Sequence, residues 1–168
     1  MRGDRRLNFV KKWFGRAKKT EDPFDRFFYL WIALVVSAQH LVRGSCESDR
    51  ERVIDYFWYN KENVLKVLSE HNDIMNRLAH RRGTRFGNPI IDAGEDLREK
   101  FRRLSDHYLR NHPLSSEEKV EIVAELLNRI RNNLFHGHKI YDDQEDISLL
   151  ELVNPLLFDV LQICEPVG

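Results

Sequence analysis

The sequence predicts an all-α fold, a single-domain bundle of five to seven helices, and two observations carry this prediction. Apolar residues recur at steps of three and four along most of the chain, whereas no stretch alternates apolar and polar residues as a strand would. The 168 residues include only five prolines and eight glycines, so few positions interrupt a helix. A chain of this length usually forms one domain, and no internal repeat is visible.

The first expected helix, residues 2–19, is basic and amphipathic. Residues 1–20 contain eight Lys or Arg and one Asp. Its apolar face is made by Leu7, Val10, Trp13, Phe14 and Ala17. We therefore divide the chain into this helix, residues 1–20, packed on the core, and a helical domain, residues 21–168. Its cationic face suits contact with RNA phosphates, contact with a membrane surface, or simple solvation.

The second expected helix, residues 22–43, is the predicted centre of the core. Asp22 and Pro23 have the residue types of an N-cap and a first helical position. Residues 27–36 are apolar without interruption, which is typical of a buried helix, and ten residues are too few to span a bilayer. We predict that its aromatic residues belong to the core rather than to a base-stacking surface.

Three further helices are expected at 49–59, 61–81 and 92–111, with Asn60 as a cap between the first two. The clearest loop is 82–91, RGTRFGNPII. Arg81, Arg82, Arg85 and Phe86 give this loop a basic, partly aromatic tip. Such a tip suits either a nucleic-acid contact or an ordinary surface loop.

The last expected helix, residues 147–164, follows an acidic turn at 142–146 and is bent or split at Asn154–Pro155. Residues 141–168 contain seven Asp or Glu and no Lys or Arg. One explanation is that the basic and acidic ends neutralise each other, within the fold or across a dimer. The net charge is zero, so no overall field attracts the chain to nucleic acid.

The segment from Ser115 to Lys139 is the most informative. Ser115 and Glu118 have the spacing of a capping box. Apolar residues at 120, 123, 127, 130 and 134 share one face. The last two turns are polar, although asparagine is a mediocre helix former. They hold Asn128, Arg131, Asn132, Asn133 and His136, of which the first, third and fifth are four apart.

Several common chemistries have no motif in this chain. There is no phosphate-binding glycine loop, no dinucleotide-binding glycine motif, no zinc-ligand spacing, no paired-cysteine motif and no Gly-x-Ser-x-Gly elbow. We therefore predict neither a metal nor a cofactor. An Arg and a His near a helix end remain. These are Arg131 and His136, five positions apart. A second pair at this spacing is 102 and 107, and the pairs 129/136 and 131/138 are seven positions apart.

Residues 131–137, RNNLFHG, resemble the signature of HEPN domains, closest to the Apea-like branch, and the segment 22–34 resembles the opening core helix of such domains. About ninety residues between them are similar only in helical character. The resemblance implies metal-independent RNA cleavage, commonly at a composite site between two protomers.

In this interpretation three residues are catalytic. Arg131 clamps the phosphate, His136 acts as acid or base, and Asn132 orients His136 or a phosphate oxygen. Asn128, Asn133, His138 and Lys139 are the predicted substrate-binding residues.

The expected partners are RNA, a second copy of the chain and, in a defence or toxin–antitoxin setting, an antitoxin protein. With two distant cysteines, no secretory signal and no membrane span, we expect a cytoplasmic protein. The alternative function is a non-catalytic helical module that binds RNA or a protein partner.

Overall fold

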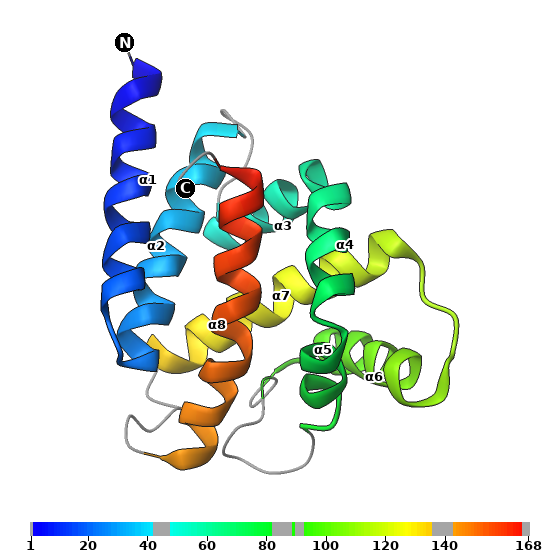
Figure 1. Cartoon of the computed structure of the whole chain (residues 1–168). Helices are drawn as coiled ribbons and strands as arrows, with labels where there is room; N and C mark the ends of the chain where they lie inside the picture. The colour runs from blue at the N-terminus through cyan, green and yellow to red at the C-terminus, as the bar shows by residue number, and fades with distance from the viewer. Residues whose placement is uncertain (1, 42–47, 82–88, 90–92, 136–142, 166–168) are drawn as a thin grey trace.

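The computed structural model describes residues 2–41, 48–81, 89, 93–135 and 143–165. Within these ranges the chain forms eight α-helices and no strand, which confirms the all-α prediction (Figure 1). The helices are α1 (Arg2–Lys19), α2 (Pro23–Leu41), α3 (Asp49–Tyr59), α4 (Lys61–Glu70), α5 (Asn72–Ala79), α6 (Glu95–Arg110), α7 (Ser116–Phe135) and α8 (Gln144–Cys164).

Eight helices are present where five to seven were predicted, because the expected helix 61–81 is divided at His71. The backbone of His71 has φ −109° and ψ 37°, outside the α-helical region. Its Nε2 atom lies 2.5 Å from Asp159 Oδ2 on α8. This contact with another helix is invisible to local sequence patterns. Asn60 stands before α4, but its side chain donates to the carbonyl of Tyr56 instead of capping α4.

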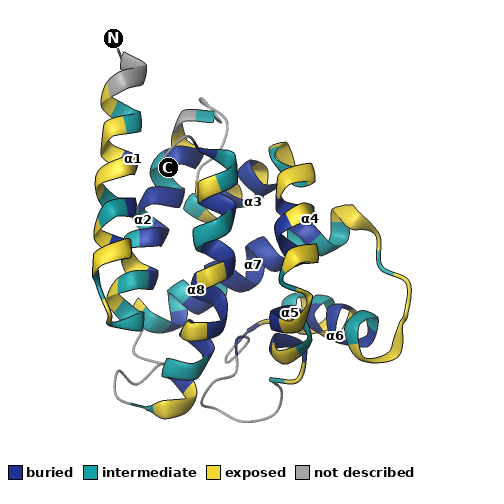
Figure 2. Ribbon diagram, viewed as in Figure 1, coloured by how far each residue is buried: buried dark blue, intermediate teal, exposed yellow. Residues whose placement is uncertain are grey.

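Helices α2, α7 and α8 supply much of the core. Figure 2 shows α7 buried along most of its length, with α3, α4 and α6 around it. α1 covers the other side through Val10, Phe14 and Ala17, which are fully or almost fully buried. The Phe14 ring stacks on Phe158 of α8 with 4.5 Å between ring centroids. The apolar face of the basic helix is therefore already occupied by the core.

Helix α8 differs from its prediction at two points. It begins at Gln144, three residues early, because the Asp143 side chain accepts hydrogen bonds from the backbone N–H groups of Glu145 and Asp146. It is also not split at Pro155, since one helix continues from Gln144 to Cys164. By length and composition alone α8 is apolar enough to cross a membrane, with a mean hydropathy of 1.6. Half of that stretch is buried, and core helices of soluble proteins pass the same test.

A buried polar cluster joins the ends of α1, α3 and α8. Tyr56 donates a hydrogen bond of 3.0 Å to Glu165 Oε1, and Arg6 Nη1 lies 3.9 Å from the same oxygen. Burial, together with the negative charge of Glu165, raises the pKa of the neighbouring Cys164 thiol to about 12. The folded state therefore favours the protonated thiol.

This raised pKa predicts a loss of stability at alkaline pH. The contribution is complete below the unfolded thiol pKa, near 8.5, and is lost as pH rises towards the folded value. Between pH 9 and pH 10 we expect the unfolding free energy to fall by at most about 1 kcal/mol, since solvent screens a partly exposed thiol. Urea unfolding at each pH measures this change. Cys164→Ala should show a shallower decline, and equal declines in both proteins would contradict the assignment.

Candidate functional site

Helix α7 is fixed at its start by the predicted capping box. Ser115 Oγ accepts a hydrogen bond from the Glu118 N–H at 3.2 Å, and Glu118 Oε2 accepts one from the Ser115 N–H at 3.4 Å. Helix α2 is also capped by a side chain, because Asp22 Oδ1 accepts hydrogen bonds from the N–H groups of Phe24 and Asp25. Both N-cap predictions are confirmed.

The middle of α7 is held by an ion cluster around Glu125, a carboxylate that is only 3% exposed. Arg50 of α3 donates to Glu125 Oε1, and Lys100 Nζ of α6 lies 3.4 Å from both carboxylate oxygens. Burial lowers the pKa of Lys100, but Glu125 with Asp96 and Glu121 raises it above its ordinary value. These contacts join α7 to two neighbouring helices on the N-terminal side of its polar end.

At the C-terminal end of α7, the Arg131 side chain is half-buried and held on two sides. Its guanidinium carbon lies 4.4 Å from the centroid of the Phe135 ring. Its Nη1 donates to Asn132 Oδ1 at 3.0 Å. Within the described ranges, Arg131 has no carboxylate partner, and its buried Nε has no hydrogen-bond acceptor. Arg131 is thus a cation held in place by an aromatic ring and an amide, without an anion.

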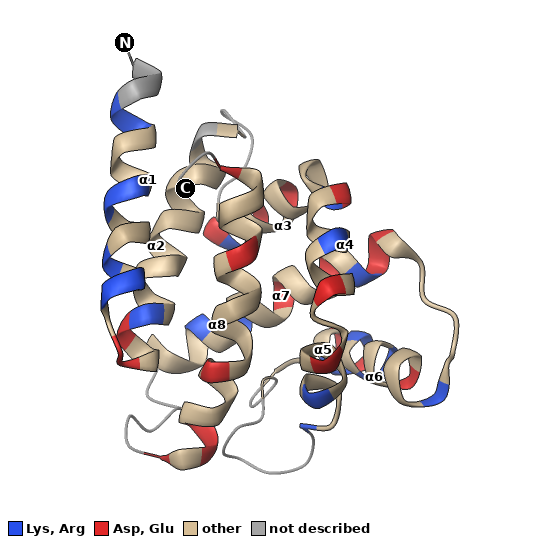
Figure 3. Ribbon diagram, viewed as in Figure 1, with Lys and Arg blue, Asp and Glu red and all other residues tan. Residues whose placement is uncertain are grey.

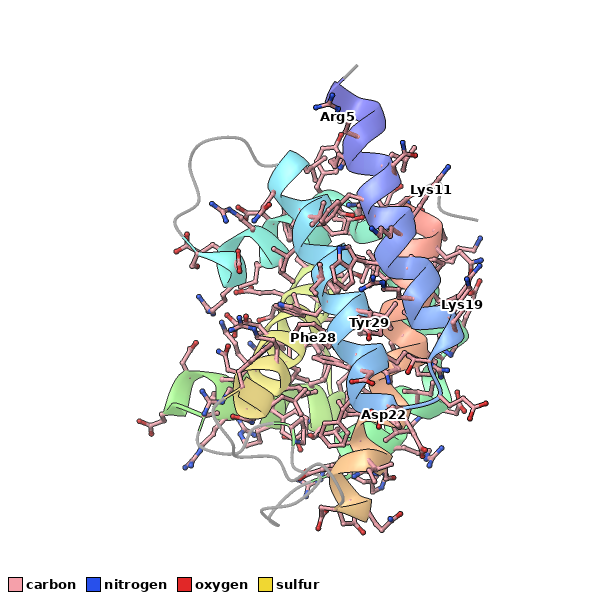
Figure 4. The ribbon with its side chains drawn as sticks, turned by 90° about the vertical axis from the view of Figure 1, so that its left-hand side faces the viewer. Arg5, Lys11, Lys19, Asp22, Phe28 and Tyr29 are labelled. Carbon is pink, nitrogen blue, oxygen red and sulfur yellow. The ribbon has the colours of Figure 1, made fainter. Side chains whose placement is uncertain are left out.

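Arg131 borders a pocket of about 220 Å³ between α2 and α7. The lining is mostly aromatic, and it is formed by Phe24, Asp25, Phe27, Phe28, Trp31, Arg131, Leu134 and Phe135. Figure 4 shows Phe28 on the side of α2 that faces α7, and its ring lies 5.8 Å from that of Phe135. Both rings are unusually exposed, at 39% and 52%.

The sequence predicted that the aromatic residues of α2 belong to the core, but not all of them do. Phe27 and Trp31 are buried, but Phe28 is a surface ring beside Arg131. The sequence signal for this exposure is weak, since Phe28 sits inside the unbroken apolar run 27–36.

The predicted site residues fall into three groups. Arg131 and Asn132 lie together at the pocket. Asn128 and Asn133 are buried, Asn133 completely, and neither amide atom of Asn133 has a hydrogen-bond partner in the described part of the chain. These two side chains lie behind the site, so a direct contact with substrate has no support from their position. His136, His138 and Lys139 lie outside the described residues.

The competing Arg102–His107 pair on α6 has a different environment. Arg102 makes ion pairs with Glu99 at 2.5 Å and with Asp106 at 2.9 Å. The His107 Nδ1 atom lies 2.8 Å from the carbonyl oxygen of His112. The charge of Arg102 is therefore already neutralised, in contrast to that of Arg131.

Among the described residues, no group of three or more His, Cys, Asp or Glu side chains is placed to hold a metal ion. Comparisons of this chain with protein-family models, with curated proteins and with solved structures give no match.

Proposed function

We propose that the chain is a metal-independent endoribonuclease that cleaves RNA at the C-terminal end of α7. The observation that carries this proposal is Arg131, a half-buried guanidinium that lies at the edge of an open pocket and has no carboxylate partner among the described residues. An unpaired Arg of this kind suits a phosphate, because its planar fork of donors matches two phosphate oxygens. The polar end of a HEPN-like helix is the sequence context that assigns the phosphate to RNA.

The reaction needs no external nucleophile. His136, as a neutral imidazole, accepts the proton of the RNA 2′-hydroxyl while this oxygen attacks the adjacent phosphorus. The bond between phosphorus and the 5′-oxygen then breaks, and the leaving oxygen takes a proton. The products are a 2′,3′-cyclic phosphate and a free 5′-hydroxyl. Arg131 stabilises the negative charge that builds on the phosphate oxygens, and Asn132 holds the guanidinium.

A second protomer completes the proposed chemistry. One protomer supplies one His136, whereas removal and delivery of a proton in the same step require two groups. A two-fold dimer brings two copies of the same helix end together. A defence or toxin–antitoxin role, with an antitoxin protein as partner, and a cytoplasmic location belong to this proposal through the HEPN resemblance.

The alternative is a non-catalytic module that binds RNA or a protein partner through the same surface. The exposed rings of Phe28 and Phe135 favour it, since exposed aromatic side chains are typical of binding surfaces.

The test compares the wild-type protein with His136→Ala on a structured RNA in the presence of EDTA. We expect wild-type cleavage with 2′,3′-cyclic phosphate ends, and a rate for His136→Ala that is lower by about a hundred-fold or more. His107→Ala is the matched control, because His107 belongs to the competing pair. This variant should cleave RNA at the wild-type rate. Wild-type protein that leaves RNA intact, or cleavage that EDTA abolishes, would overturn the proposal.

A further inference from the structure

We infer that α1 carries a docking track for single-stranded RNA that leads to Arg131. Cleavage of the bound strand at Arg131 rests on the proposed function. The track begins at a cation–aromatic stripe, defined as Arg5, Phe9, Lys12, Trp13 and Arg16. At 3.6 residues per turn, four of these residues fall within about 60° of the helix circumference, namely Arg5, Phe9, Lys12 and Arg16. Trp13 flanks them.

The stripe is open to solvent. Arg5, Lys12 and Arg16 are exposed, and the Phe9 side chain is 49% exposed although it is a large apolar ring. Figure 3 shows Lys and Arg repeated along the whole outer side of α1, and Figure 4 shows α1 beside α2 on one face of the molecule.

The cations of α1 are largely unpaired. Among its described cationic side chains, only Arg6 has a carboxylate within 4 Å, namely Glu165. The acidic C-terminal segment therefore neutralises α1 at one position, and the cations of the stripe keep their charge. On α6, by contrast, Arg102 and Arg103 are paired with Glu99 and Glu118. A row of unpaired cations fits a polyanion, which binds by releasing its own counterions.

A chain of aromatic contacts connects the stripe to the candidate site. Phe9 contacts Trp13, Trp13 contacts Tyr29 of α2, Tyr29 contacts Phe28, and Phe28 contacts Phe135. The centroid distances in this order are 6.2, 5.7, 6.1 and 5.8 Å. Guanidinium groups lie over two of these rings, Arg16 over Trp13 at 4.9 Å and Arg131 over the last ring, Phe135, at 4.4 Å.

This composition favours a single strand over a duplex. Unpaired bases stack on exposed aromatic rings and on the planes of Arg side chains, whereas a duplex hides the faces of its bases. Phe9, Phe28 and Phe135 offer such rings, and the guanidinium of Arg16 lies over Trp13. The exposed carboxylate of Asp25 lines the pocket, and it should repel phosphates locally.

The same geometry disfavours a membrane surface as the occupant. An interfacial helix inserts its apolar face between lipids. The apolar face of α1, which includes Val10, Phe14 and Ala17, is buried against the core. What α1 presents to solvent is a cationic face with one exposed ring, Phe9, along it.

The test measures binding of a short fluorescent oligouridylate that is 2′-O-methylated throughout, so that it cannot be cleaved. The variant Arg5→Ala/Lys12→Ala/Arg16→Ala removes three cations from the stripe. We expect its affinity at 0.1 M salt to be lower by about ten- to a hundred-fold, and the slope of log affinity against log salt to flatten by about 2. Phe9→Ala should lower affinity by about ten-fold through lost stacking.

The control variant, Lys11→Ala/Lys66→Ala/Arg98→Ala, removes the same charge from exposed positions outside the stripe. It should bind the RNA like the wild type. All the substituted residues are exposed, and circular dichroism with urea unfolding verifies that each variant folds. Equal losses in the two triple variants would show a general charge effect and overturn the inference. Stripe-dependent binding to phosphatidylserine vesicles but not to the RNA would overturn it as well.

Binding and cleavage fail independently. If wild-type protein cleaves RNA while the stripe variant binds and cleaves normally, the track is wrong and the ribonuclease stands. If the non-cleavable RNA binds through the stripe but wild-type protein never cleaves, the ribonuclease is wrong and the track stands.

Discussion

Arg131→Ala is expected to lower the rate of RNA cleavage by about a hundred- to a thousand-fold, the usual cost of removing one donor that stabilises transition-state charge. The guanidinium lies at the pocket with no carboxylate partner in the described part of the chain, so its positive charge is available to a phosphate. A single-turnover assay with excess protein measures the chemical step and separates it from weaker binding.

Two further variants sharpen this prediction. Arg131→Lys keeps the charge but loses the planar fork, and we expect an intermediate rate. Arg98→Ala removes an exposed cation of α6 and should cleave like the wild type. Urea unfolding of Arg131→Ala is needed as well, because the variant also loses the contact with Phe135. A folded Arg131→Ala protein that cleaves at the wild-type rate would exclude Arg131 from the chemistry.

Glu125→Ala is expected to lower the unfolding free energy by about 2–3 kcal/mol. The buried carboxylate accepts charge-assisted hydrogen bonds from Arg50 and Lys100, and such bonds contribute about 1.5–3 kcal/mol each. Its removal leaves these two cations without their shared anion. Because both are partly exposed, water solvates them and the loss stays below the full sum.

Glu121→Ala is the matched control for Glu125→Ala. Glu121 is on the same helix and also contacts Lys100, at 3.3 Å, but its side chain is 43% exposed. We expect its removal to change stability by about 0.5 kcal/mol or less. Chemical denaturation of both variants gives the comparison. Similar losses would mean that burial of the carboxylate does not govern the strength of the cluster.

Local rules in the sequence predicted the starts of α2 and α7 well. The N-caps at Asp22 and Ser115 depend on residues within three positions of one another, and the structure has both. The helix 2–19 has its predicted bounds. At the break between α4 and α5, His71 contacts Asp159, a residue of another helix, and no periodic pattern contains that information.

The polar end of α7 was harder to predict for a related reason. Residues 122–128 of α7 are all buried, because neighbouring helices cover this helix on most sides. The apolar stripe therefore marks only part of the buried surface of α7. Asn128 lies in the interior although it is polar. Arg131 and Asn132 were selected as candidate site residues by their residue types and their spacing. The contact of the Phe28 ring with Phe135 joins two helices, so only the tertiary structure shows it.

The contact between Arg131 and Phe135 has a consequence for conformational entropy. A free Arg side chain loses up to about 2 kcal/mol of rotamer entropy when a ligand fixes it. In this protein the ring and the Asn132 amide already restrict the guanidinium, so folding meets much of that cost before any ligand arrives. An anion then meets an ordered fork, and up to about thirty-fold in affinity is retained that a freely rotating Arg would lose.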